Sequence, residues 1–323
     1  MNSRERVLAV LNHGIPDRVP TYEVLIDAPM VETVLGIKGH NSAMLQPGDL
    51  VQLHKALGLD AIVCGLKFFR PRDQLLGKQL SISKIIRPSR EDCDAAMARA
   101  VETARIAHEE GLATAAYTHG AFDVLYESLG FENFMMLLYD DFDYVQELAE
   151  LLFSHHFLSA QEALTHDFDW MVVGDDVAFK TGLFIRPDMF LDIWKAREEK
   201  LFVFIQAAGR AVEFHSDGKL DFIMPYLIEM GVALVNPIEP YSNNIREIKA
   251  KYGSRIALRG NIDIAGALAN GTPAEVYEET RQLVLDLKPG GNYICSTSHS
   301  ITPAVKPENY CMLHQAVLDY GQY

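Results

Sequence analysis

His215 and Asp217, two residues apart in the segment EFHSDG, could supply a nitrogen and an oxygen ligand to one metal ion. Side chains at positions i and i+2 of an extended strand point to the same face, so both reach one site if the strand persists. Together with His299 and a carboxylate such as Glu239, they would form a tetrahedral zinc site with nitrogen and oxygen ligands. The pair also admits a plainer interpretation, in which His215 hydrogen-bonds in a polar setting and Asp217 caps the following helix. Glu23 and Asp176 are further carboxylates that could complete such a site.

Asp175 and Asp176, in the segment VVGDD, are candidates for proton transfer. Two adjacent carboxyl groups can act as an acid–base pair, because each one raises the pKa of the other. The alternative is that one caps the next helix while the other faces solvent, but we expect at least one to act in catalysis. Tyr126, in FDVLYESLG, lies in a segment that could reach the same site, and Asp263, in RGNID, adds a further candidate catalytic carboxylate.

The elements that must position these residues form a repeated unit of an apolar run, a polar turn and a helical segment. Strand–helix alternation with continuous apolar strands predicts a parallel sheet covered by helices, and eight units predict a (β/α)8 TIM barrel. An open doubly wound sheet is the alternative, but it usually has a glycine-rich turn after its first strand, where this chain has EVLIDAP. The eight predicted strands are Val19–Leu25, Asp60–Gly65, Leu112–Thr118, Trp170–Gly174, Ala211–Phe214, Val232–Asn236, Arg255–Arg259 and Asn292–Ser296.

Catalytic residues of such a barrel lie at the carboxyl ends of its strands. Seven of the eight predicted strands end in an acid, an amide or a histidine, and we expect these side chains to gather at one rim. They are Glu23, His119, Asp175 with Asp176, His215 with Asp217, Glu239, Asn261 with Asp263, and His299.

Several helices are also predicted around this barrel. A helix over Thr272–Leu287 would start from Thr272 as its N-cap with Pro273 in its first turn, and the last helix would span Pro307–Tyr320. A long helix is expected over Tyr144–His166. We also expect an N-terminal helical extension, an extra hairpin strand over Ser81–Pro88, and one domain over residues 1–323.

Composition limits the partners. The chain has 323 residues, 49% of them apolar and 23% charged, and a formal net charge of −15. This charge argues against binding to nucleic acid or to anionic membranes, and no apolar run approaches the length of a membrane span. Four single cysteines without CxxC pairs and an N-terminus unlike a signal peptide predict a cytoplasmic protein.

Five segments taken together resemble the uroporphyrinogen decarboxylase superfamily. They are RERVLAVLNHGIPDRVP, GDDVAFKTGLFIRPDMF, FHSDGKLDFIMPYLIEMGVALVNPIEP, RGNIDIAGAL and GGNYICSTSHSITPAVKPENY. The resemblance covers nearly the whole chain and implies a (β/α)8 barrel. It also implies one of two chemistries: cofactor-free decarboxylation of a tetrapyrrole, or zinc-dependent methyl transfer involving a corrinoid.

The decarboxylase branch is the weaker match. His299 and Tyr126 resemble its late histidine and its active-site tyrosine, but its arginine-rich N-terminal loop corresponds here to VPTYEVLIDAP, with no arginine between Arg18 and Arg70. Its essential aspartate after the second strand corresponds to VCGLKFF. An octacarboxylate substrate would need basic groups that the sequence does not reveal. Decarboxylation, or a catalytically inactive ligand-binding barrel, is therefore the alternative.

The methyltransferase branch is the closer match. Its thiol-methylating members hold zinc with a His-x-Cys pair and a later cysteine; here His215 matches, Asp217 replaces the cysteine and His299 falls near the later one. Nitrogen and oxygen ligands leave zinc a stronger Lewis acid than thiolates do, which favours cleavage of a methyl–oxygen bond. The resemblance therefore predicts methyl transfer from a small methylated substrate, such as an aryl methyl ether, to the Co(I) corrinoid of a partner protein. Family members are often dimers, so a homodimer is expected.

Overall fold

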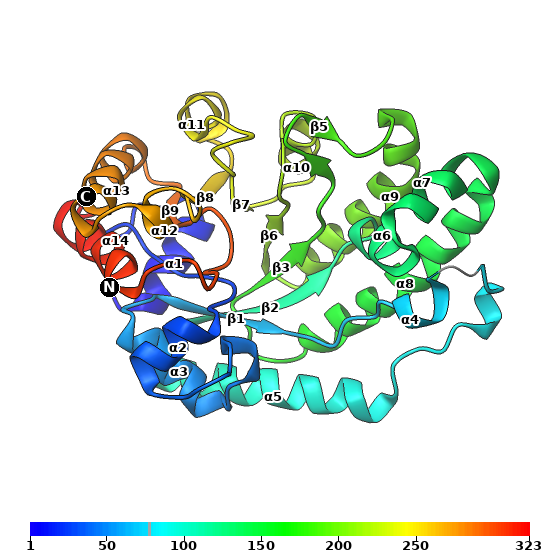
Figure 1. Cartoon of the computed structure of the whole chain (residues 1–323), viewed down its shortest axis with the longest axis horizontal. Coiled ribbons are helices and arrows are strands. Elements are labelled where there is room, and N and C mark those ends of the chain that lie inside the picture. Colours follow the sequence, from blue (N-terminus) through cyan, green and yellow to red (C-terminus); the bar gives the residue numbers. More distant parts are fainter. Residues whose placement is uncertain (77–78) are drawn as a thin grey trace.

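The computed structural model describes residues 1–76 and 79–323, and its main sheet is a curled set of parallel strands surrounded by helices (Figure 1). In the described part of the chain this sheet has seven strands, in the order β1–β2–β3–β6–β7–β8–β9. They are β1 (Ala61–Gly65), β2 (Ala113–His119), β3 (Trp170–Gly174), β6 (Ala211–His215), β7 (Leu234–Asn236), β8 (Ala257–Ile262) and β9 (Tyr293–Thr297). Because all neighbouring strands pair in parallel, their carboxyl ends share one rim. This confirms the predicted α/β barrel.

The predicted first strand, Val19–Leu25, is not a strand, although the segment takes its place in the barrel. Cys295 of β9 donates its N–H to Pro20 O at 3.0 Å, and Asp60, just before β1, donates to Thr21 O at 2.7 Å. The segment therefore joins the two edges of the curled sheet by single bonds rather than by a ladder. Pro20 is one physical reason, because proline has no N–H to donate to a neighbouring strand.

Helices surround the sheet, and those that follow strands cover its outer face. They are α1 (Ser3–Leu11), α2 (Ala28–Leu35), α3 (Pro47–Ala56), α4 (Arg72–Leu75), α5 (Arg90–Glu109), α6 (Asp123–Leu129), α7 (Phe131–Asp140), α8 (Phe142–Ala163), α9 (Pro187–Ala207), α10 (Met224–Glu229), α11 (Ile245–Tyr252), α12 (Ala267–Asn270), α13 (Pro273–Leu287) and α14 (Pro307–Tyr320). Two short 3₁₀ turns lie at Ser42–Met44 and Ile82–Lys84.

Alternation along the strands separates two layers of side chains. In β6, Val212 and Phe214 pack into the layer between sheet and helices, whereas Glu213 and His215 lie on the other face, toward the barrel interior. At the amino end of the strands the interior is apolar and is closed by α1, whose Val7 and Val10 pack against the barrel. The polar interior residues therefore lie above this plug, nearer the rim.

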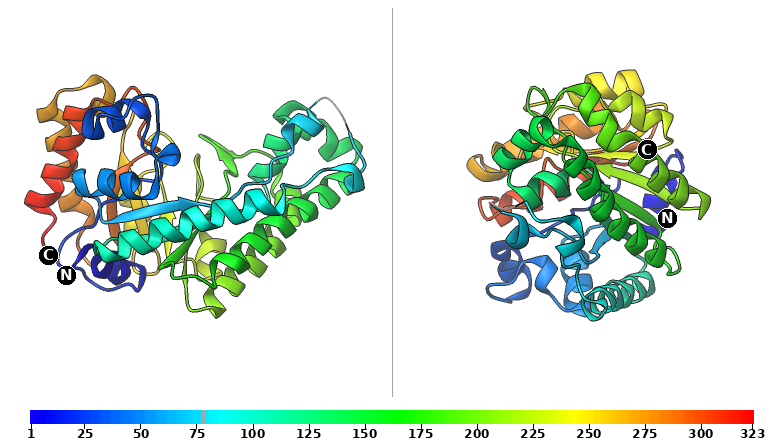
Figure 2. Two further views of the ribbon diagram at one scale, coloured as in Figure 1. Left: turned by 90° about the horizontal axis from the view of Figure 1, so that it is seen from below. Right: turned by 90° about the vertical axis from the view of Figure 1, so that its right-hand side faces the viewer.

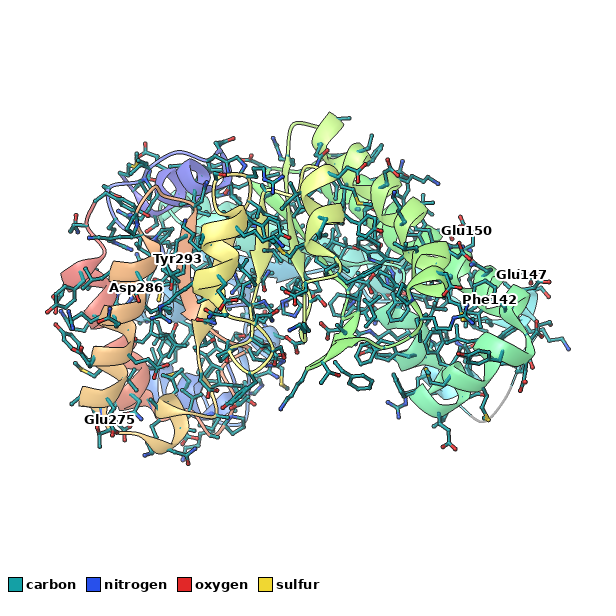
Figure 3. The ribbon with its side chains drawn as sticks, turned by 90° about the horizontal axis from the view of Figure 1, so that it is seen from above. Phe142, Glu147, Glu150, Glu275, Asp286 and Tyr293 are labelled. Atoms are coloured by element: carbon teal, nitrogen blue, oxygen red, sulfur yellow. The ribbon has the colours of Figure 1, made fainter. Side chains whose placement is uncertain are left out.

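The predicted last two helices are confirmed. Thr272 caps α13, with Glu275 N donating to Thr272 Oγ1 and Thr272 N donating back to Glu275 Oε2. Figure 3 shows Glu275 and Asp286 toward the two ends of α13, with Tyr293 of β9 to the side of the helix near Asp286. The long helix predicted over Tyr144–His166 is α8, which starts two residues earlier and ends three residues earlier.

The extra strand predicted over Ser81–Pro88 is wrong. The segment contains the 3₁₀ turn Ile82–Lys84, and Ile86 exchanges two hydrogen bonds with the side-chain amide of Gln74. That amide satisfies the backbone groups that a neighbouring strand would otherwise pair with. The hairpin that the structure does contain is β4 (Ala178–Phe179) with β5 (Gly182–Leu183), after β3.

Helices α4, α6 and α7, with the adjoining ends of α5 and α8, extend to one side of the barrel (Figure 2). Glu147 and Glu150 lie on the exposed side of α8 in this region (Figure 3). Among the described residues, no helix combines the length and the apolar character that crossing a membrane requires.

Candidate functional site

Asp176, His215 and Asp217 come together at the carboxyl ends of β3 and β6. One potential ligand atom from each lies within 4.8 Å of the others, and all three residues are half-buried. Asp217 donates its backbone N–H to Asp176 Oδ1 at 2.8 Å, which holds the two acidic residues side by side. Asp217 Oδ1 is buried and has no hydrogen-bond partner in the described part of the chain. We call these three residues the rim triad.

The tautomer of His215 is fixed from below by Asn236. His215 Nδ1 lies 2.6 Å from Asn236 Oδ1. The orientation of this amide is set because Asn236 Nδ2 donates to Glu213 Oε1 at 2.7 Å, which leaves Oδ1 as an acceptor. His215 Nδ1 must therefore carry a hydrogen, and in the neutral ring the lone pair is on Nε2. A neutral histidine with a free Nε2 is ready to bind a metal, and a second residue that orients the ring is typical of metal sites.

A buried ion pair in the barrel interior supports Asn236. Arg259 and Glu213 are almost fully buried and bond at 3.0 Å. Arg259 also donates to Asn236 Oδ1 at 2.5 Å, and Tyr22 and Trp170 each donate to Glu213 at 2.7 Å. Because every polar group in this network has partners, it forms a rigid base for the rim triad.

His299, predicted as a metal ligand, lies beside the rim triad. Its Nε2 is 3.2 Å from Asp217 Oδ2, and this carboxylate raises the pKa of His299 above its ordinary value. Burial raises the pKa of Asp217, but the hydrogen bond from His299 and the charge of His299 outweigh it and leave that pKa lowered. His299 Nε2 is thus engaged by Asp217, whereas its Nδ1 is buried and has no hydrogen-bond partner in the described part of the chain.

Glu239, the other predicted ligand, faces the same region. It accepts a hydrogen bond from Gly218 N at 2.7 Å, and burial raises its pKa, with the charge of Asp217 adding to the effect. Ligation by Glu239 or His299 remains a prediction. Glu23 lies elsewhere, buried between the segment 19–26, β9 and α14, where it accepts from Thr297 and Tyr310.

Asp175 points away from the rim triad. It is fully buried and accepts from the backbone N–H groups of Phe122 (3.0 Å) and Asp123 (2.6 Å) at the start of α6. Burial raises its pKa well above the ordinary value, and the charge of Asp123 adds to this. Asp175 thus caps a helix, but that helix is α6, which precedes it in the chain, and not the next helix that the alternative named. Asp176 is the member of the pair that lies in the rim triad.

The other two predicted catalytic residues differ in their distance from the rim triad. Tyr126, on α6, donates its hydroxyl to the backbone oxygen of Asp176 at 3.1 Å, so it adjoins the site. Asp263 accepts from the Tyr241 hydroxyl and from Ala265 N in the turn after β8, and it is not part of the triad.

Sequence reasoning missed Tyr117, which lines the cavity beside the rim triad. Burial raises its pKa well above the ordinary value, and the charges of Asp123 and Asp176 add to this, so the phenol remains a hydrogen-bond donor. A Cβ at Gly174 would lie 1.8 Å from the Tyr117 hydroxyl, so only glycine at the end of β3 leaves room for it. Tyr117 precedes the strand-end His119 by two residues, and this same-face spacing was the signal available in the sequence.

His119, expected at the rim, has both ring nitrogens bonded. Arg70 donates to its Nε2 at 2.7 Å, so Nδ1 carries the hydrogen that is shared with Asp123 Oδ2 at 2.8 Å. Burial lowers the pKa of His119, with Arg70 adding to the effect, and burial raises that of Asp123 to about 8, with Asp176 adding to the effect. His119 is therefore neutral and positioned beside the site, with no nitrogen left over for a metal.

A cavity of about 530 Å³ opens next to the rim triad. It is lined by the carboxyl end of β1, by parts of α3 and α5, and by Tyr117, His119 and His215. Most of its wall is apolar, which is typical of a small-molecule pocket. The sequence suggested no basic groups for a substrate cleft, but Lys67, Arg70 and Arg99 line this cavity.

The rim triad fits zinc by its chemistry. Asp217 Oδ1 is buried and lacks a partner in the described part of the chain, and His215 and Asp176 each offer a further ligand atom at the same point. Zinc accepts imidazole nitrogen and carboxylate oxygen together, and three protein ligands leave a position open for a substrate atom.

Known proteins resemble this chain in fold and in part of its sequence. A methyltransferase from Methanosarcina mazei superposes with a TM-score of 0.75 and 17% identity over 99% of both chains. A Bacteroidetes-affiliated GH5 cellulase superposes with a TM-score of 0.52 and 11% identity over 96% of this chain and 93% of its own. These similarities establish the fold.

Curated uroporphyrinogen decarboxylases are similar to this chain in sequence over a short stretch. The protein from Pseudoalteromonas translucida is 32% identical over 78 residues, which is 24% of this chain and 22% of the relative. The chain thus aligns with about a fifth of the length of these curated relatives. The model of the family "Uroporphyrinogen decarboxylase (URO-D)" matches residues 50–320. This match spans most of the chain, and the chain belongs to the uroporphyrinogen decarboxylase family.

Proposed function

We propose that this protein is a zinc-dependent methyltransferase that takes a methyl group from a small aryl methyl ether. The acceptor would be the Co(I) corrinoid of a separate partner protein. The observation that carries this proposal is the rim triad, which places a histidine nitrogen and two carboxylates together beside a mostly apolar cavity. The full-length structural similarity to a protein described as a methyltransferase supports it.

Asp176, His215 and Asp217 would hold the metal, with His299 or Glu239 as a further ligand. Bound zinc would act as a Lewis acid toward the ether oxygen, and the corrinoid would supply the electron pair for the new bond to the methyl group. When the carbon–oxygen bond breaks, its electron pair stays on oxygen, which then takes a proton.

The chain's own residues would position the substrate and manage this proton. Tyr117 lines the cavity and its hydroxyl keeps its hydrogen, so it would donate to the leaving oxygen. Phe68 stacks edge-on against His119 with ring centroids 4.3 Å apart, and this aromatic wall would align an aryl ring. Fixing the methyl group in line with the acceptor supplies much of the rate enhancement expected in such a reaction.

The first test is zinc stoichiometry after loading and exhaustive dialysis. We expect about one zinc per chain in the wild type and none in His215→Ala or in Asp217→Asn. His40→Ala serves as the matched control, because His40 is exposed and bonds only to a nearby carbonyl. A wild-type protein that retains no zinc would overturn the ligand assignment.

The second test supplies the zinc-loaded protein with an aryl methyl ether and a free Co(I) corrinoid. The visible spectrum should change to that of the methylated corrinoid, and the change should be lost in His215→Ala. The alternative of decarboxylation predicts the opposite pattern, namely porphyrinogen turnover that a chelator does not affect. The basic residues in the cavity favour that alternative, but its octacarboxylate substrate would need more than the three cations found there.

A further inference from the structure

The cavity beside the rim triad has an unusual charge for this protein. The chain as a whole carries 44 acidic and 29 basic residues. In the described part of the chain, three cations line the cavity, Lys67, Arg70 and Arg99, and no aspartate or glutamate does. A cavity with cations and no acids in so acidic a protein selects an anion.

Arg99 is the cation with the most unused capacity for hydrogen bonds and ion pairs. It projects from α5, which packs beside β1 (Figure 2), and it is half-buried. One guanidinium nitrogen donates to Leu45 O at 2.5 Å, and no carboxylate of the described residues lies within ion-pair distance. Arg70, by contrast, is paired with Glu127 at 2.6 Å. A guanidinium that is partly desolvated and not neutralised fits a ligand carboxylate, which can accept two parallel hydrogen bonds from it.

The surroundings of Arg99 agree with this role. Burial raises the pKa of the Cys64 thiol to about 12, and the positive charge of Arg99 opposes this rise, which places the guanidinium near the wall formed by β1. Lys67 lies on the same cavity and has no ion-pair partner among the described residues. The other wall residues here are mainly apolar, including Leu50, Phe68 and Ala100.

The cavity therefore has two chemically different ends. His215 belongs both to the cavity lining and to the rim triad, so one end adjoins the acidic, metal-fitting cluster. Lys67 and Arg99 line the same cavity together with apolar side chains, whereas Arg70 bonds to His119. A ligand that fills the cavity would present an electron-rich oxygen to the triad and an anion to Arg99.

We propose that the methyl donor is an aryl methyl ether that also carries a carboxylate, and that Arg99 binds this carboxylate with Lys67 as a secondary partner. This inference rests on the proposed function for the identity of the methylated group. Arg99 is thereby assigned as a specificity-determining residue, not a catalytic one.

Equilibrium binding tests this assignment without requiring methyl transfer. The zinc-loaded protein would be titrated with 4-methoxybenzoate and with its neutral counterpart 4-methoxybenzamide, by calorimetry. We expect the wild type to bind the carboxylate at least about tenfold more tightly, because a charge-assisted bidentate pair is stronger than the hydrogen bonds that a neutral amide can make. Arg99→Gln should lose this preference, and Arg99→Lys should retain part of it.

Arg90→Gln is the matched control, since Arg90 lies on the same helix but is exposed and paired with Asp94 at 2.8 Å. It should bind both probes as the wild type does. Circular dichroism would establish that each variant is folded. Equal affinity of the wild type for the two probes, or a preference that survives in Arg99→Gln, would overturn the proposal, as would failure to bind either probe.

The two proposals can fail separately. If Arg99 confers a preference for the carboxylate but no methyl group reaches a Co(I) corrinoid, the anion site stands and the methyltransferase assignment fails. If methyl transfer proceeds equally well from a neutral aryl methyl ether in the wild type and in Arg99→Gln, the methyltransferase assignment stands and the anion site fails.

Discussion

The chemistry of His215 depends on residues that lie beneath it in the barrel. Its free Nε2 follows from a chain of contacts that begins at Glu213, fixes the amide of Asn236 and ends at His215 Nδ1. Arg259 completes this chain by donating to the same amide oxygen. A histidine two residues from an aspartate is common in sequences, and what makes this one suited to a metal is the fixed tautomer.

Asn236→Ala tests this dependence at the scale of one residue. Without the amide, the ring of His215 is free to rotate and to take either tautomer, so zinc affinity should fall by about 10–100-fold. The measurement is a competition titration of zinc against a chromophoric chelator, with the folded fraction of the variant checked by urea unfolding.

Asn261→Ala is the comparison variant, because Asn261 is also an amide at the rim but donates to the backbone oxygen of Ile238. Its zinc affinity should stay within about twofold of the wild type, a change small in free energy. Undiminished zinc affinity in Asn236→Ala would show that the tautomer is fixed by other means.

At the scale of elements, the barrel depends on how the irregular segment 19–26 is held between β9 and β1. Asp60, at the entrance to β1, is fully buried and accepts five hydrogen bonds, from Ser3, Arg6, Thr21 and twice from Arg18. One carboxylate therefore ties α1, the following loop and the irregular segment to the first strand.

Asp60→Asn should destabilise the fold by about 3–5 kcal/mol, because it leaves the largely buried Arg18 guanidinium without its counter-charge and removes one of the two carboxylates that pair with Arg6. Urea unfolding followed by circular dichroism measures this. Asp167→Asn is the control: the side chain of Asp167 is 73% exposed, so its loss should cost less than about 1 kcal/mol. A similar loss in both variants would contradict the role of Asp60.

Glu23 lies in the segment 19–26 that joins β9 to β1, and it makes the stability of the barrel sensitive to pH. Burial raises its pKa to about 7, against the opposing hydrogen bonds from Thr297 and Tyr310. Between its ordinary pKa of 4.5 and about 7, the folded state holds a proton that the unfolded state has released. The free energy of unfolding should therefore fall as pH rises through this window, by up to about 3 kcal/mol from this group.

The measurement compares the wild type with Glu23→Gln, whose side chain does not titrate. The difference in unfolding free energy between the two proteins should change between pH 4.5 and pH 7 and then level off. A difference that is constant across this range would show that Glu23 is ionised at both ends of it.

For the whole molecule, a metal that binds only the folded state should stabilise it. Zinc at about one hundred times its dissociation constant should add about 2.7 kcal/mol to the free energy of unfolding. The melting temperature should rise accordingly with zinc and return to the apo value with a chelator. His215→Ala should melt at the same temperature with and without zinc, and a zinc-induced rise in that variant would place the metal elsewhere.

The sequence by itself determined the barrel and the rim. Apolar runs that alternate with helical segments can bury both faces only in a parallel sheet covered by helices, and this local pattern is readable without knowing which strands are neighbours. Strand ends then predicted where polar residues gather, and His215, Asp217 and Asp176 do lie together. The capping box of α13 was equally local and equally readable.

Only the tertiary structure decided which polar residues share a site and which way each one faces. It separated Asp175, which caps α6, from its neighbour Asp176, and it brought Arg99 from α5 and Tyr117 from β2 to one cavity. It also showed that residues 19–26 close the barrel without forming a strand. The physical reason is that these outcomes depend on hydrogen bonds and burial between segments far apart in the chain, and neither is encoded in the residues on either side of a position.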